Sequence, residues 1–258
     1  MNWLLLNSGK CAPAFNMALD EALLEAMPRL QRPALRFYGW TEPAATFGYF
    51  QKYAEVERAI MLRPLIRRPT GGGIVPHDAD WTYSLAFPPD HEWHSLTAQE
   101  SYRRVHEWIR LAFTKLNTAT ELAPSCKGVT IGSSRREEAL SSSAECGMRS
   151  AESSQSLLTS AATAQCFVGH VKFDLLWHGK KIAGAAQRRN KLGLLVQGSV
   201  QPPLISLARA GWERAMVEEG ATASGIAWSD FAPDRPLRER TAALVRQKYS
   251  QPEFITRR

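Results

Sequence analysis

The sequence RRPTGGGIVPHD, residues 67–78, sets three consecutive glycines between two arginines and a His-Asp pair. Glycine has no Cβ, so a strand that enters residues 71–73 can bring its backbone against a ligand where other residues would collide. Arg67 and Arg68 could pair with a carboxylate or a phosphate beside it. The alternative is a flexible turn between strands. The chain has no GxxxxGK[ST] motif and no GxGxxG motif that opens a helix, which argues against a phosphate loop and a dinucleotide site.

Strand patterns surround this glycine segment on both sides. Apolar, β-branched and aromatic residues recur in short runs bounded by Gly, Pro and turn residues, which is typical of strands. The expected strands are NWLLLN (2–7), ALRFYGW (34–40), AATFGYF (44–50), LRPLIRRP (62–69), WTYSLAF (81–87), KFDLLW (172–177), KKIAGAAQ (180–187) and GLLVQGSV (193–200). His178-Gly179 joins two of these runs and predicts a two-residue hairpin turn.

Helical patterns lie toward the two ends of the chain. Apolar residues recur at helical spacing over 14–27, and Pro28 is expected to stop that helix. Thr97 and Glu100 form a capping box, which predicts the start of a long amphipathic helix. The tail, 204–250, is helical in pattern, with loops expected at Pro233 and Pro236.

These elements predict an α/β (α+β) fold with a mixed, largely antiparallel sheet and helices packed on it. The length of 258 residues suits a single domain over 1–258. Ten of the 33 residues in 133–165 are serine and none is aromatic, so we expect a mobile surface insertion there.

Composition narrows the functional classes. No apolar run approaches the roughly 18 residues of a membrane span. The formal net charge of +7 favours acidic partners, but the arginines are spread along the chain, which argues against nucleic acid. Four scattered cysteines without CxxC spacing indicate reduced thiols in the cytoplasm and no zinc site.

Lysine and small residues share one expected strand. Strand alternation puts Lys180 and Lys181 on opposite faces, so one of them should point inward. The small residues that follow, among them Gly184 and Ala186, leave space for something long and apolar. An inward lysine there could stabilise a developing oxyanion or hold a carboxylate.

Two further candidates have equally simple structural alternatives. His77 and Asp78 could orient one another or a substrate, although a His-Asp pair is common by chance. Cys166 could attack a thioester if a nearby cation lowers the pKa of its thiol, although cysteine is also a common buried residue.

Together these motifs resemble the lipoate/biotin protein ligase superfamily over most of the chain. The resemblance is carried, in order, by AFNMALDEALL, RFYGW, TFGYFQ, RRPTGGGIVPHD, WTYS, CF, KKIAGAAQRR and QGS. Within the superfamily the sequence is most similar to the octanoyltransferases whose nucleophile is a cysteine just before the lysine strand. The resemblance implies a ligase-type catalytic domain with one mixed sheet.

The resemblance also implies roles for single residues. Cys166 would be the acyl-carrying nucleophile, and Lys181 would lie at the acyl carbonyl. The acyl pocket would be lined by Arg68, Gly71, Gly72, Gly73, His77 and Asp78.

The activity implied is that of an octanoyl-[acyl-carrier-protein]:protein N-octanoyltransferase in lipoate biosynthesis and protein lipoylation. Such an enzyme moves octanoate from acyl carrier protein through a cysteine thioester to a lysine of a lipoyl-accepting protein. That acceptor would be the glycine cleavage H protein or the E2 lipoyl domain of a dehydrogenase. Thioester to amide is downhill, so we expect no cofactor, no metal and no ATP.

Two alternatives remain open at this point. A lipoate–protein ligase would need ATP and Mg²⁺ and act through lipoyl-AMP, with Cys166 incidental. A non-catalytic carrier-binding protein of the same fold is the second. Two departures bear on the choice: the family usually has histidine where Gln197 stands, and the intact GGG is closer to the ATP-using ligases.

Overall fold

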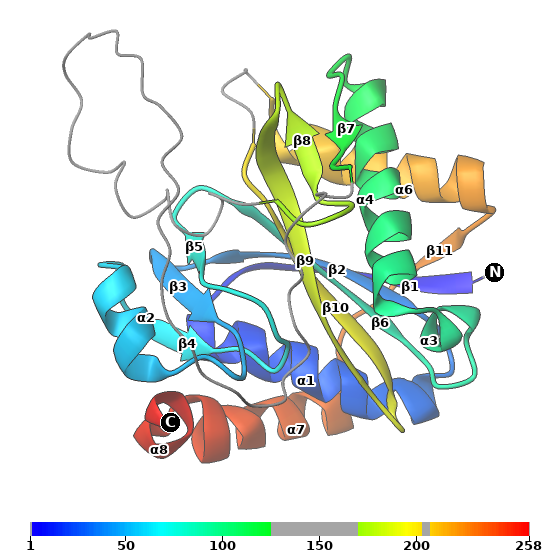
Figure 1. Ribbon diagram of the computed structural model, residues 1–258. Coiled ribbons are helices and arrows are strands. Elements are labelled where there is room, and N and C mark those ends of the chain that lie inside the picture. The colour runs from blue at the N-terminus through cyan, green and yellow to red at the C-terminus, as the bar shows by residue number, and fades with distance from the viewer. Residues whose placement is uncertain (1, 125–169, 203–206, 258) are drawn as a thin grey trace, which may run out of the picture.

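The computed structural model describes residues 2–124, 170–202 and 207–257, and two β-sheets organise this part of the chain (Figure 1). The larger sheet has eight strands in the order β11-β1-β2-β6-β10-β9-β8-β7. Its strands are β1 (Asn2–Cys11), β2 (Ala34–Trp40), β6 (Trp81–Phe87), β7 (Glu121–Leu122), β8 (Leu175–Trp177), β9 (Lys180–Asn190), β10 (Gly193–Val200) and β11 (Ala227–Asp230). Among these described strands, β1 pairs in parallel with β2 and β11, and the other pairs are antiparallel. The predicted mixed, largely antiparallel sheet is confirmed.

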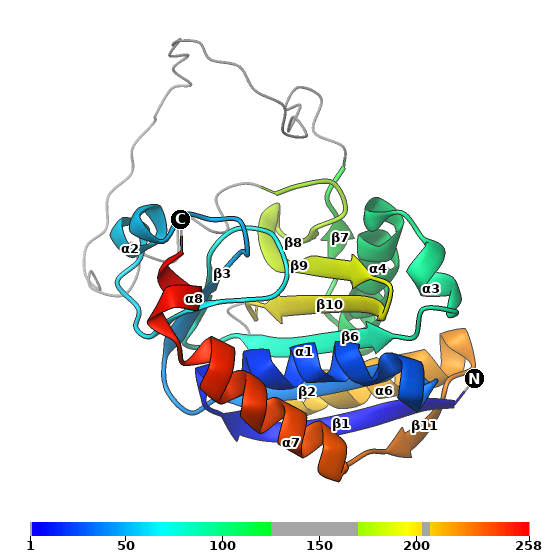
Figure 2. The same ribbon diagram turned by 90° about the horizontal axis from the view of Figure 1, so that it is seen from below.

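Helices cover both faces of the larger sheet (Figure 2). On one face, α1 (Pro13–Leu30) packs on β6 and β10 and is covered in turn by α7 (Arg235–Leu244). On the other face, α4 (Ala98–Lys115) and α6 (Arg209–Ser224) pack together over an aromatic core. Shorter helical segments are α2 (Tyr53–Ala59), α3 (Glu92–Ser95), the π-helical turn η1 (Val245–Tyr249) and α8 (Pro252–Thr256).

A second sheet of three strands positions the glycine segment. Its order is β4-β3-β5, with β4 (Leu65–Arg67), β3 (Ala44–Phe47) and β5 (Val75–His77). It has a small core of its own with α2. The glycine segment, residues 68–74, connects β4 to β5 of this small sheet. It lies beside β9 and β10 of the larger sheet (Figure 1).

Two short-range sequence signals correctly predicted the observed geometry. His178 and Gly179 have φ of 48° and 71°, the left-handed values that a two-residue hairpin turn needs, and they join β8 to β9. Thr97 caps α4 by accepting a hydrogen bond from the backbone N–H of Glu100 (3.2 Å). The Glu100 carboxylate bonds Arg103 and Arg104 instead of closing the capping box.

Four expectations are wrong. Pro28 does not stop α1, because it lies in the last turn, where its missing N–H removes only one bond of the helix. Pro236 is the second residue of α7, after the N-cap Asp234, and proline is tolerated in the first turn because its N–H would have no partner within the helix. The tail also contains β11, which needs β1 as a distant partner. β3 ends at Phe47, before the Gly-Tyr-Phe that the expected strand included. The predicted insertion, 133–165, lies outside the described residues.

The glycine segment packs against a fourth glycine. A Cβ built on Gly48, directly after β3, would lie 2.0 Å from the carbonyl oxygen of Gly72. Gly72 has φ of +86°, and a Cβ there would meet Nη2 of Arg68 at 2.7 Å. Gly71 and Gly73 have no atom within 4 Å of a built Cβ. The close backbone approach that the structure shows is therefore between Gly48 and Gly72. The expected approach of residues 71–73 to a ligand stays a prediction.

We expect Gly48→Ala to lower the free energy of unfolding by about 1–3 kcal/mol, because the added methyl meets backbone that cannot rotate away. Urea denaturation followed by circular dichroism measures the change. Gly71→Ala is the matched control and should stay within about 0.5 kcal/mol of the parent. Equal stabilities for the two variants would contradict the packing described.

Candidate functional site

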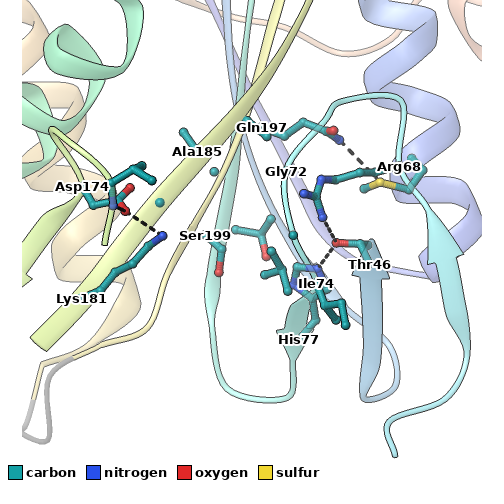
Figure 3. Close-up of a pocket in the computed structure, with 18 of the residues that line it drawn as sticks. Thr46, Arg68, Gly72, Ile74, His77, Asp174, Lys181, Ala185, Gln197 and Ser199 are labelled. Atoms are coloured by element: carbon teal, nitrogen blue, oxygen red, sulfur yellow. Dashed lines mark hydrogen bonds and ion pairs between the residues drawn. The ribbon is translucent and has the colours of Figure 1, made fainter. Parts of the chain in front are cut away.

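A cavity of about 220 Å³ lies between β9 and β10 of the larger sheet and the glycine segment, β3 and β5 of the smaller sheet (Figure 3). Its lining is mostly apolar or small. Its lining includes Val171, which is 49% exposed, and the buried Met17 and Gln197, which are 2% and 6% exposed. Seven of the expected site residues line it: Arg68, Gly72, Gly73, His77, Lys181, Gly184 and Ala186. Gly71 and Asp78 do not.

Lys181 is the lysine of β9 that points inward. Its Nζ lies 2.8 Å from Oδ2 of Asp174, and the two side chains are 15% and 4% exposed. Lys180 is exposed. The prediction that one of the two lysines faces inward is thus confirmed, and the structure identifies which one.

Gly184 makes room for Lys181. A Cβ on Gly184 would lie 2.9 Å from Cε and 3.1 Å from Nζ of Lys181. The sequence predicted that the small residues of this strand leave space for a long apolar group. Ala185 and Ala186 do face the cavity, but the space at Gly184 is also used by the lysine side chain.

Arg68 holds the glycine segment from inside the cavity wall. Its guanidinium donates to the carbonyl of Gly71 and, at 3.2 Å, to Oγ1 of Thr70, and it is 5% exposed. It also reaches Oγ1 of Thr46 at 3.5 Å. Arg68 therefore fixes the backbone of the glycine segment, which forms part of the cavity wall.

Arg67 turns away from the cavity, unlike the sequence expectation that both arginines face a ligand. Its buried guanidinium donates to backbone carbonyls of two separate segments of the chain. The acceptors are the backbone oxygens of Tyr49, Gln51, Phe254, Ile255 and Arg257. Arg67 thus ties α8 and the residue after it to the turn that follows Gly48.

His77 is paired with Asp80 and not with Asp78. Its Nδ1 lies 2.9 Å from Oδ2 of Asp80, its Nε2 lies 2.8 Å from Oγ1 of Thr46, and its ring stacks on Trp40 with centroids 3.9 Å apart. Asp78 is exposed and accepts from the N–H of Ala79. The adjacent-pair hypothesis is wrong, because Asp80 is the acid at the entry of β6 that faces inward.

Gln197 belongs to a buried polar network that sequence reasoning missed. Its Nε2 donates to Oδ2 of Asp20 at 2.7 Å, and its Oε1 accepts from Oγ1 of Thr70 at 2.8 Å. Asp20 also accepts from Arg36 (2.7 Å) and from the hydroxyl of Tyr38 (3.0 Å). Burial, together with the Asp20 charge, raises the pKa of Tyr38 well above its usual value. One available signal was an aspartate within the apolar helix run MALDEALL.

Cys166 lies outside the described ranges, so its role stays a prediction from the sequence. Within those ranges, no cluster of three or more His, Cys, Asp or Glu side chains is arranged to hold a metal ion. None of the helices described there is long and apolar enough to cross a bilayer.

Residues 12–201 match the family model of the lipoyl protein ligase A/B catalytic domain. The chain is 35% identical to the octanoyltransferase LipM of Geobacillus kaustophilus over 206 residues, which cover 77% of this chain and 64% of that protein. It is 31% identical to the octanoyltransferase LipM of Bacillus subtilis, with the same two shares. The chain thus spans about 64% of the length of these curated relatives.

Two solved structures share the fold. A putative lipoate protein ligase from T. acidophilum with bound lipoic acid superimposes with a TM-score of 0.71 at 18% identity, over 99% of both chains. A lipoate-protein ligase A bound with ATP gives a TM-score of 0.72 at 18% identity, again over 99% of both chains. At 18% sequence identity, these two structures support the fold of this chain and not a shared activity.

Proposed function

Because the chain belongs to the lipoyl protein ligase A/B catalytic domain family, we propose that it is an octanoyltransferase acting in protein lipoylation. The observation that carries the proposal is the cavity. It is largely apolar, the buried Met17 and Gln197 contribute to its lining, and the Lys181 side chain lies in its wall. Such a cavity suits a straight acyl chain, since each buried methylene contributes about 0.8 kcal/mol. The relatives named octanoyltransferase support the same reaction.

In the proposed first step, the Cys166 thiolate attacks the carbonyl of an octanoyl thioester on an acidic acyl carrier protein. The C–S bond to the carrier breaks, and the carrier leaves as a thiolate, which takes up a proton equivalent to the one that the Cys166 thiol lost. Lys181 would favour the thiolate and the negative charge that develops on the carbonyl oxygen. Arg68 and the wall residues Gly72, Gly73, His77 and Ala186 would hold the chain in place.

In the second step, the amine of a lysine on a lipoyl-accepting protein attacks the acyl-cysteine. An amide forms, the cysteine thiol is released, and the amine loses one proton. A thioester is higher in free energy than an amide, so the proposal requires no cofactor and no ATP. We propose that the whole of 1–258 acts as one catalytic domain, in the cytoplasm, where thiols stay reduced.

The test is to incubate the protein with octanoyl-carrier and no ATP and to measure its intact mass. We expect one octanoyl group to be added at Cys166 and then removed when a lipoyl domain is supplied. No mass increase, with free octanoate or lipoate incorporated only in the presence of ATP and Mg²⁺, would reject the proposal in favour of a ligase.

Gly184→Ala is expected to lower the transfer rate by up to about 10²-fold, because its methyl would displace the Lys181 side chain. Steady-state kinetics with octanoyl-carrier measures the change. Gly71→Ala is the matched control: a Cβ there meets nothing within 4 Å, and Gly71 does not line the cavity. A loss as large in the control would contradict an effect that acts through Lys181.

A further inference from the structure

Asp174 contacts Lys181 and the backbone of the adjoining turn at the same time. Its Oδ2 lies 2.8 Å from Nζ of Lys181 and accepts the N–H of Val171, also at 2.8 Å. Figure 3 shows the carboxylate and the ammonium facing each other at one side of the cavity. One oxygen therefore couples the cation on β9 to the turn that contains Val171, a residue of the cavity lining.

The backbone of Asp174 is itself fixed on two sides. The N–H of Ala123 donates to its carbonyl at 2.7 Å, and the N–H of Phe173 donates to the carbonyl of Ala123 at 3.0 Å. His106 on α4 donates from Nδ1 to the carbonyl of Phe173 at 2.6 Å. The carboxylate thus projects from a turn that α4 and the residue after β7 hold in place.

Three other titratable groups near Asp174 carry no charge at neutral pH. Burial lowers the pKa of His106 to about 4, so its imidazole is neutral. Burial and the Asp174 charge raise the pKa of Tyr83 on β6, and burial raises that of Tyr102 on α4. Lys181 is the cation in direct contact with the carboxylate.

We propose that Asp174 is a positioning residue that holds the Lys181 ammonium at the cavity wall before any substrate binds. Lysine has four rotatable side-chain bonds, and ordering them costs conformational entropy. The ion pair with Asp174 holds the Lys181 ammonium in place, and the missing side chain of Gly184 provides the space that the lysine occupies there. The chemical role of that arrangement rests on the proposed acyl transfer, but the restraint on the lysine does not.

Asp174→Asn isolates the charge, because asparagine keeps an oxygen that can accept the N–H of Val171. The first measurement is competitive labelling with acetic anhydride at pH 7, read by peptide mass spectrometry. Lys181 should react about tenfold faster in the variant, a change equivalent to about 1.4 kcal/mol. Exposed Lys180 is the internal control and should react equally in both proteins.

The second measurement is octanoyl transfer from octanoyl-carrier. We expect kcat to fall by about tenfold or more while KM changes little, since the lysine would act on the reacting carbonyl and not on the chain. Asp174→Glu, which restores the charge, should recover part of kcat. Thermal unfolding midpoints of the variants report any loss of fold.

Unchanged labelling of Lys181 in Asp174→Asn would overturn the proposal, even if activity fell, because Asp174 would then act only through the fold. Faster labelling with unchanged kcat would confirm the restraint on Lys181 and overturn its role in the transfer. If the wild-type protein transfers no octanoyl group, the proposed function fails by itself, and the labelling still decides whether Asp174 restrains Lys181.

Discussion

Replacing Cys166 by serine should abolish octanoyl transfer and the octanoyl mass on the protein while leaving donor binding intact. Serine has nearly the size of cysteine and keeps its hydrogen-bonding capacity. An unperturbed cysteine thiol has a pKa of about 8.5, whereas a hydroxyl is far less ionised, so the nucleophile is lost without a change of shape. Intact-mass measurement and binding of octanoyl-carrier separate the two effects.

Cys11→Ser is the matched control for this substitution. Cys11 is partly buried, and its thiol donates to the backbone carbonyl of Ser8, a contact that serine can also make. The control variant should therefore retain wild-type transfer. If Cys166→Ser also kept wild-type activity, and that activity required ATP, an ATP-dependent ligase would replace the octanoyltransferase.

Lys181→Ala should lower the transfer rate by about 10²–10³-fold, the usual loss when one group that stabilises a developing oxyanion is removed. Removing the cation should also slow alkylation of Cys166 at neutral pH, because less of the thiol would be ionised. Kinetics with octanoyl-carrier and a profile of alkylation rate against pH measure the two effects.

Lys180→Ala controls for the loss of a positive charge on the same strand. Its side chain is exposed, whereas Lys181 is only 15% exposed and faces the cavity. We expect transfer at the wild-type rate. A similar loss in both variants would mean that strand β9 needs its net charge, and not a lysine at one position.

Short-range signals in the sequence predicted most of the fold. The turn at His178-Gly179 and the cap at Thr97 depend on neighbours within a few residues, and both were confirmed. β11 was missed because four residues form a strand only when β1 lies beside them. Pro28 and Pro236 were misread because the effect of proline depends on which turn of a helix it occupies.

The candidate site was predicted less completely, for a related reason. Strand alternation showed that one lysine of β9 faces inward, the family resemblance indicated Lys181, and the packing shows that Lys181 is the inward one. The roles of Asp174, Asp80 and Asp20 were missed. The partner of each carboxylate lies on another segment of the chain or several residues away, and the sequence alone does not show which side chains come into contact. Gly48 was overlooked because its neighbour is Gly72, 24 positions further on.

The contacts of Arg67 have a consequence for the order in which parts of the protein fold during synthesis. Its acceptors in and after α8 follow it by 187–190 residues. At about 5–20 residues per second on the ribosome, the Arg67 guanidinium waits about 10–40 s for them. During that interval Arg67 can reach its acceptors Tyr49 and Gln51 in the turn after Gly48, while its acceptors in and after α8 do not yet exist. The docking of α8 on Arg67 should therefore be among the last steps of folding, whatever the speed at which the central strands pair.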